Sequence, residues 1–165
     1  MNYIIPPTLS GPRTTQYRMR LTVGEHSPQY VRRIVRSYLR EWEMAELTDA
    51  VELGVTELLA NVVRHVPDRR CEFLLLRQAA GVRVEVMDGC PRLPSIPAEL
   101  PLEAEGGRGL VLLDGVADKW GVEPAAAGGK TVWFECWGEG VGEGGAASTG
   151  VGVDSRTALT PSPKP

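Results

Sequence analysis

Hydrophobic and polar residues alternate from position 17 to 23, and this period of two predicts a strand with one buried face. In two longer segments that follow, apolar residues recur every three or four positions, which predicts amphipathic helices. The first begins at Ser27-Pro28, since serine can cap a helix and proline is tolerated at its first position. The second begins at Thr48-Asp49 and ends before Pro67, which cannot continue a helix. Their apolar residues are Val31, Ile34, Val35, Tyr38, Leu39 and Trp42, then Val51, Val55, Leu58, Leu59, Val62 and Val66.

The rest of the pattern predicts an α/β two-layer sandwich, with a mixed, mostly antiparallel sheet and helices packed on one face. The further elements are strands at 71–77 and 82–87, joined by a hairpin near Ala79-Ala80-Gly81, a helix at 107–116, and strands at 119–122 and 130–137. The uncovered sheet face must be solvated or covered by a second copy. Trp133 and Trp137 are candidates for that contact, although packing within the core is the commoner use of tryptophan.

All of these elements belong to one predicted domain, residues 16–137. Residues 1–15 are rich in proline and predict an extended leader, and residues 138–165 are rich in glycine, lack aromatic residues and predict a disordered tail. Residues 89–106 contain four prolines between two elements. A loop of this length inside a domain usually serves function, often as a lid.

Composition excludes several classes of function. The net charge of −3 gives no basic field for nucleic acid, and the cluster Arg32, Arg33, Arg36 and Arg40 is more typical of a solvated helix face than of a docking patch. Three cysteines without C-x-x-C spacing and two histidines argue against a zinc site or a disulfide framework. No apolar segment approaches the length that spans a bilayer. We therefore expect a cytoplasmic protein.

Glu57 and Asn61 lie four residues apart in the second helix, so their side chains share one helical stripe. Asn61 offers a neutral oxygen to a hard cation such as Mg²⁺, and Glu57 could accept a proton from an attacking hydroxyl or water. The helical pattern places both residues roughly opposite the apolar stripe. The alternative interpretation is therefore that they are solvent-facing polar residues.

Asp88 shares the parity of Val82, Val84 and Val86, so its carboxylate should lean toward the covered side of the sheet where the strand ends. A buried carboxylate needs a donor, and the exocyclic amine of adenine would be one. Thr131 on a neighbouring strand could help through its hydroxyl. The alternative is an aspartate that caps the following turn.

Gly107-Arg108-Gly109-Leu110 opens the third helix. Glycines allow close approach of the backbone, and the N–H groups at a helix start favour phosphate oxygens. Alone the motif is weak, because G-x-G also occurs in plain turns. The lid-like segment before it strengthens the interpretation of this motif as a phosphate-binding site.

Taken in this order, the motifs resemble the GHKL ATPase superfamily, and among its members the small bacterial anti-sigma factor serine/threonine kinases. The resemblance covers about residues 17–137. It implies that Glu57 is the general base, that Asn61 is the Mg²⁺ ligand and that Asp88 reads adenine. It further implies that Gly107, Arg108, Gly109 and Leu110 hold phosphates and that Thr131 supports the adenine pocket.

The resemblance implies a kinase that transfers the γ-phosphate of MgATP to an anti-anti-sigma protein, with homodimerisation and sigma-factor binding as further expectations. One stretch departs from the family pattern, because Cys90 and Arg92 stand where glycines are expected in Asp88-Gly89-Cys90-Pro91-Arg92. This stiffer turn leaves ATP binding expected but favours a second hypothesis, a non-catalytic ATP-binding module that sequesters its partner. Cys90 is either a reactive thiol near the site or, more commonly for cysteine, a small space-filling residue.

Overall fold

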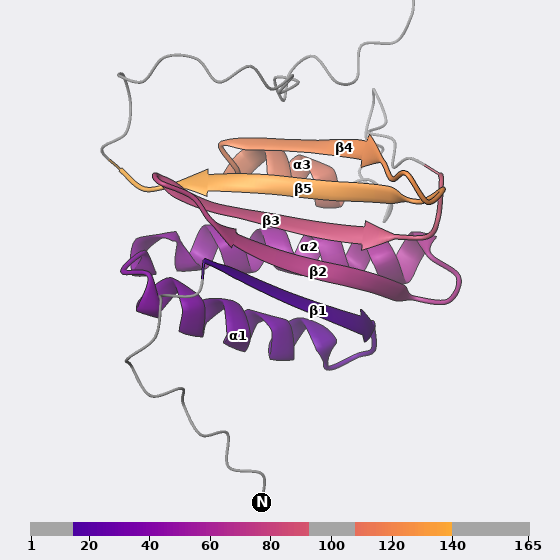
Figure 1. Cartoon of the computed structure of the whole chain (residues 1–165), viewed down its shortest axis with the longest axis horizontal. Helices are drawn as coiled ribbons and strands as arrows, with labels where there is room; N and C mark the ends of the chain where they lie inside the picture. Colours follow the sequence, from indigo (N-terminus) through magenta and orange to yellow (C-terminus); the bar gives the residue numbers. More distant parts are fainter. Residues whose placement is uncertain (1–14, 93–107, 140–165) are drawn as a thin grey trace, which may run out of the picture.

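Five strands form one sheet in the order β1-β2-β3-β5-β4 (Figure 1). The computed structural model describes residues 15–92 and 108–139, with the backbone alone at 108–110. Each neighbouring pair of these strands is antiparallel, so the predicted two-layer α/β fold is confirmed with no parallel pair among the described strands. The strands are β1 (Gln16–Thr22), β2 (Arg70–Arg77), β3 (Gly81–Asp88), β4 (Lys119–Pro124) and β5 (Lys130–Trp137).

The helices lie on one side of the sheet; in the view of Figure 1 the second and third lie behind the strands and the first lies below β1. They are α1 (Ser27–Glu41), α2 (Thr48–His65) and α3 (Arg108–Val116), with a short 3-10 turn η1 (Ala45–Leu47) that the sequence pattern did not predict. α1 packs on β1, where the rings of Tyr17 and Tyr38 lie 5.2 Å apart. α2 occupies the middle of the helical layer and contacts α1, α3, β3 and β5.

The predicted apolar faces supply the core between the two layers. Val31, Val35 and Leu39 of α1 are fully buried, as are Val82 and Val84 of β3. The start of α1 differs from the prediction in one detail. The Ser27 hydroxyl accepts a hydrogen bond from the Gly24 N–H at 2.9 Å and does not cap the helix, because Ser27 already lies within its first turn.

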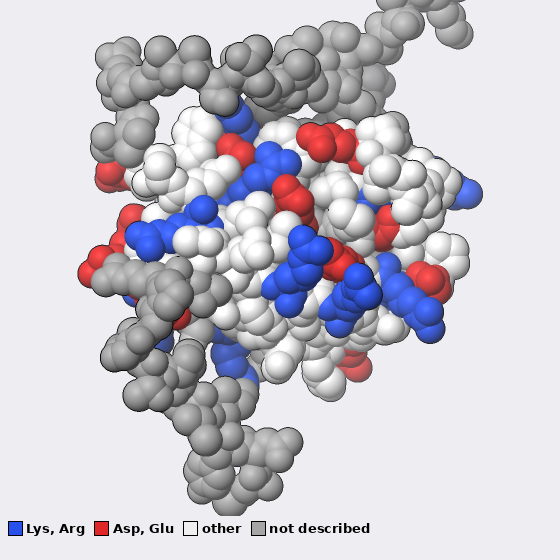
Figure 2. Space-filling view, viewed as in Figure 1, with Lys and Arg blue, Asp and Glu red and all other residues white. Residues whose placement is uncertain are grey.

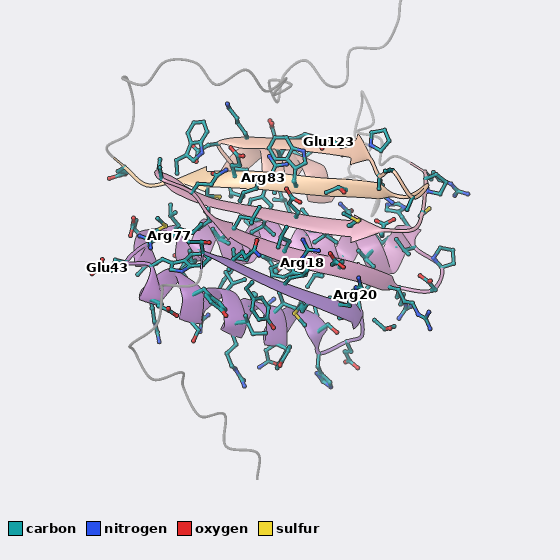
Figure 3. The ribbon with its side chains drawn as sticks, in the orientation of Figure 1. Arg18, Arg20, Glu43, Arg77, Arg83 and Glu123 are labelled. Atoms are coloured by element: carbon teal, nitrogen blue, oxygen red, sulfur yellow. The ribbon has the colours of Figure 1, made fainter. Side chains whose placement is uncertain are left out.

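The other sheet face carries charged side chains of both signs (Figure 2). Glu72 accepts from Arg18 and Arg20, and Arg83 pairs with Glu85 and Glu135. Arg18, Arg20, Arg83 and Glu123 are labelled on this face in Figure 3. We refer to it as the open face.

Trp133 lies on the open face but is only 5% exposed. Its ring covers Gly121, where an added Cβ would lie 2.8 Å from a ring carbon, and the Arg83 guanidinium stacks 3.9 Å above the ring centre. Its indole N–H donates to Glu123 at 3.1 Å. Trp133 is therefore packed within its own chain, whereas Trp137 is 38% exposed.

Several predictions fall on residues that the structure does not describe. Residues 1–14 of the predicted leader, residues 93–106 of the predicted lid and residues 140–165 of the predicted tail lie outside the described residues. Within residues 15–92 and 108–139, no helix combines the length and apolar character needed to cross a membrane.

Candidate functional site

The second half of α2 lies over the end of the sheet at which Asp88 is found. Gly54 sits directly on Phe134 of β5, since a Cβ at Gly54 would meet that ring at 2.5 Å. After α2 ends at His65, only residues 66–69 precede β2, whose Cys71 pairs with Asp88. α2 therefore runs from the middle of β5 toward Asp88.

Asn61 lies on the buried side of α2, which corrects the expectation that it projects away from the apolar stripe. It follows Gly54 by seven residues, about two helical turns or 10 Å, and so shares the face that packs on the sheet and α3. Its residue exposure is 9%. Its Nδ2 is the one buried side-chain atom without a hydrogen-bond partner in the described part of the chain. An amide held in this way is poised for a ligand.

Glu57 lies one turn before Asn61 on the same side of α2 and is half-buried. Among the described residues, no hydrogen bond or ion pair uses its carboxylate. By contrast, Glu52 lies on the opposite side of α2 and accepts two hydrogen bonds from Arg36 of α1, at 2.7 and 3.0 Å. Glu57 thus remains available to accept a proton.

Asp88 faces the helix-covered side as its parity predicts, and it is 6% exposed. Its Oδ1 accepts the backbone N–H of Cys90 at 2.8 Å, so the turn-capping interpretation is also correct. The same oxygen accepts Lys130 Nζ at 2.9 Å. Hydrogen bonds between described residues leave Oδ2 unused.

The structure does not bring the Thr131 hydroxyl to Asp88. Thr131 pairs with Met87 and Glu123, and residues directly opposite on antiparallel strands share a face, so its side chain points to the open face. This corrects the prediction, which considered the neighbouring strand but not its register.

Lys130, one position earlier, is the residue that pairs with Asp88, and the pattern of the sequence did not predict this pair. The available signal in the sequence was a lysine at the start of a mostly apolar strand, and the structure leaves its side chain only 3% exposed. The pairing itself became visible only once the register between β3 and β5 was known.

α3 directs its first turn toward the same end of the sheet. It ends at Val116, just before β4, whose Lys119 pairs with Glu135 near the far end of β5. Because α3 runs behind β4 and β5, its start lies toward Asp88 (Figure 1). The bond from Trp120 Nε1 to Asp114, 2.9 Å, ties the helix to β4.

Of the predicted phosphate motif, Gly107 lies outside the described residues. Arg108, Gly109 and Leu110 form the first turn of α3, and only their backbone is described. The free N–H groups of such a turn suit phosphate oxygens.

The three cysteines differ in accessibility. Burial raises the pKa of Cys71 to about 12, with a further contribution from the neighbouring Asp88 charge. Burial likewise raises the pKa of Cys136 to about 12. Both thiols therefore stay protonated at neutral pH. Cys90 is half-buried and packs against the core, in agreement with a space-filling role.

These residues fit a magnesium-bound nucleotide. Mg²⁺ in nucleotide sites takes one or two protein oxygens and completes its shell with phosphate oxygens and water. The Asn61 amide can supply one such oxygen, since the two ends of an amide exchange by a simple flip. Asp88 Oδ2 offers an acceptor for a base amine. We find no cluster of three or more acidic, histidine or cysteine ligands within the described ranges, so a cation here would depend on the phosphates.

Two hollows lie on the described part of the molecule, and the larger one includes Asp88. It has a volume of about 530 Å³, opens on the open face, and is lined by Arg20, Arg70, Asp88 and the turn between β4 and β5. The other, of about 390 Å³, lies between the loop that follows β1 and the second half of α2. Neither is lined by Asn61 or Glu57.

The sequence profile of the histidine kinase-like ATPase domain matches residues 21–136, more than half of the chain. The chain belongs to this family. An uncharacterized protein of Streptomyces coelicolor is 38% identical to it over 72 residues, which are 42% of this chain and 69% of that protein. The matched range of the histidine kinase-like ATPase domain contains every predicted site residue. Membership supports an ATP-binding regulatory function.

Proposed function

We propose that this histidine kinase-like ATPase domain is an anti-sigma-factor-type serine/threonine kinase, which transfers the γ-phosphate of MgATP to a partner anti-anti-sigma protein. The observation that carries the proposal is the placement of Asn61, Asp88 and the first turn of α3 at one end of the helix-covered sheet. Glu57 stands at the edge of that group without a partner among the described residues. We include a sigma factor among the partners, and a homodimer as the assembly.

Each residue has a distinct part in the proposed reaction. Asp88 accepts a hydrogen bond from the adenine amine, and the first turn of α3 binds the phosphates. Asn61 binds Mg²⁺, which neutralises phosphate charge when bound. Glu57 accepts the proton of the serine or threonine hydroxyl as its oxygen attacks the γ-phosphorus and the β–γ bridging bond breaks. Catalysis then depends mainly on positioning and charge neutralisation.

One observation favours a second function, a non-catalytic ATP-binding module that sequesters its partner. The turn after Asp88 has Cys90 and Arg92 in place of glycines, and Lys130 and Cys90 already bond Asp88 Oδ1. Such a rigid turn suits long retention of nucleotide better than rapid turnover.

Incubation with γ-labelled ATP and a candidate anti-anti-sigma protein separates the two functions. The kinase should label a serine or threonine of the partner, and Glu57→Gln should lower the rate by at least ~100-fold, since general bases typically contribute 10²–10⁴-fold. The Kd for ATP should change less than about threefold, because Glu57 contacts the attacking hydroxyl and not the nucleotide.

Glu52→Gln is the matched control, since it makes the same change on the side of α2 that faces α1. It should retain wild-type transfer. ATP binding without any labelling would support the sequestering module. Equal transfer by wild type and Glu57→Gln would exclude Glu57 as the base.

A further inference from the structure

Lys130 and Asp88 form the most deeply buried ion pair among the described residues. Both side chains are 3% exposed, and Lys130 Nζ lies 2.9 Å from Asp88 Oδ1. The other ion pairs in this part of the chain each include partners that are at least 14% exposed. The buried pair joins the ends of β3 and β5, which lie side by side.

Stability alone gives a weak reason for such a pair. Removing two charges from water costs several kcal/mol per ion, and apolar replacements of buried pairs are often neutral or stabilising. Val86 and Val132, the next pair on the same face, show that apolar residues pack well here. The buried Lys130–Asp88 pair therefore indicates a functional role and not only a structural one.

The bonds of Lys130 fix how Asp88 is presented. Its ammonium also donates to the Cys90 carbonyl at 3.2 Å, while Asp88 Oδ1 accepts the Cys90 N–H at 2.8 Å. Lysine, aspartate and turn thus form a closed ring of hydrogen bonds. Oδ1 is committed to this ring, so Oδ2 is the oxygen left for a ligand.

The ammonium also controls the chemical character of that oxygen. Asp88 Oδ1 accepts from two donors, the Lys130 ammonium and the Cys90 N–H, and this arrangement suits a carboxylate that only accepts hydrogen bonds. The Oδ2 of such a carboxylate attracts the amine at position 6 of adenine and repels the carbonyl oxygen that hypoxanthine and guanine carry there.

We infer that Lys130 is a positioning residue that determines the preference of this site for 6-aminopurine nucleotides over 6-oxopurine nucleotides. The inference rests on the proposed function, in which Asp88 receives the base. Lys130 acts through Asp88 and need not touch the nucleotide.

The test compares Lys130→Met with wild type in binding ATP, inosine triphosphate and inorganic tripolyphosphate, each with Mg²⁺. Wild type should prefer ATP to inosine triphosphate by at least ~10-fold, since a site built for a hydrogen bond strongly rejects a mismatched group. The variant should reduce that ratio to within about threefold of unity. Tripolyphosphate lacks a base, so its Kd should change less than twofold. If Lys130 had a purely structural role, its replacement would weaken the binding of all three ligands by one common factor.

Lys119→Met is the matched control, because Lys119 lies on the open face above Trp137. It should keep the wild-type ratio. If Lys130→Met fails to fold, Asp88→Asn/Lys130→Met removes both charges and leaves no unpaired ion. The amide at position 88 can donate or accept, so this variant should also lose the preference for ATP.

The outcomes separate the two claims. An unchanged ratio in Lys130→Met would overturn the role of Lys130 and leave ATP binding intact. An unchanged ratio in the double variant would overturn the assignment of Asp88 to the base together with the role of Lys130. Wild type could bind tripolyphosphate as tightly as it binds either nucleotide. In that case the base adds nothing to the affinity, the assignment of Asp88 to the base fails, and this inference fails with it.

Discussion

At the scale of the residue, Asn61 carries a cost that a ligand would relieve. Its buried Nδ2 has no partner within the described residues. A buried polar group without a hydrogen bond destabilises a fold by about 1–3 kcal/mol. We expect Asn61→Leu, which has similar volume, to raise the free energy of unfolding of the nucleotide-free protein by about 1 kcal/mol. The same variant should lose the stabilisation that MgATP gives to wild type. Urea unfolding with and without MgATP measures both effects.

Removal of the metal provides the companion measurement. If Asn61 acts through the cation as proposed, EDTA should reduce the ATP-dependent stabilisation of wild type and should have no effect on Asn61→Leu. The assignment of Asn61 as the metal ligand would be contradicted if Asn61→Leu were less stable than wild type without nucleotide. It would also be contradicted if MgATP stabilised Asn61→Leu as much as it stabilises wild type.

At the scale of the element, the seating of α2 depends on Gly54. A Cβ there would lie 2.5–2.8 Å from three atoms of the Phe134 ring. Alanine favours a helix over glycine by about 1 kcal/mol, but overpacking a core costs about 1–3 kcal/mol. Because the ring is fully buried and cannot move away, we expect Gly54→Ala to lower the melting temperature and to weaken ATP binding by shifting Asn61.

Gly115→Ala on α3 is the control, since an added Cβ there would meet no atom within 4 Å in the described residues, apart from its chain neighbours and the backbone of its own helix. It should be neutral or stabilising. A double variant, Gly54→Ala/Phe134→Leu, should recover part of the lost stability. A Gly54→Ala protein as stable as wild type would show that α2 is not held against Phe134 as closely as described.

The elements themselves could be predicted because each has a regular hydrophobic period. β5 begins and ends as the sequence pattern indicates, and α2 begins at the predicted Thr48. Pairing between distant elements could not be predicted in this way. The face of Thr131 and the partner of Lys130 depend on the register between β3 and β5, which local patterns do not encode. Asn61 was misplaced for a related reason, because the helical period does not reveal that α3 covers that side of α2.

At the scale of the whole molecule, the two sides of the sheet offer different sites at the same end. Behind the sheet lie Asn61, Asp88 and the first turn of α3. In front lies the hollow on the open face, which includes Asp88 and Gly129 beside Arg20 and Arg70. Gly129 packs against the backbone of Asp88, so a ligand on either side would contact the same strand end. Its volume alone would favour the hollow as the nucleotide site. The polar groups of Asn61 and of the first turn of α3 favour the helix-covered side.

Hydrogen exchange can decide between these sides in one experiment. If MgATP binds behind the sheet, amides at 57–65 of α2 and in the first turns of α3 should exchange more slowly, since binding suppresses local opening. Amides of β1, which lines the hollow but lies far from α3 in the sheet order, should be unaffected. The hairpin at Ala79-Ala80-Gly81, at the opposite end of the sheet, serves as the internal reference. Protection of β1 without protection of α2 would place the nucleotide on the open face and exclude Asn61 as its metal ligand.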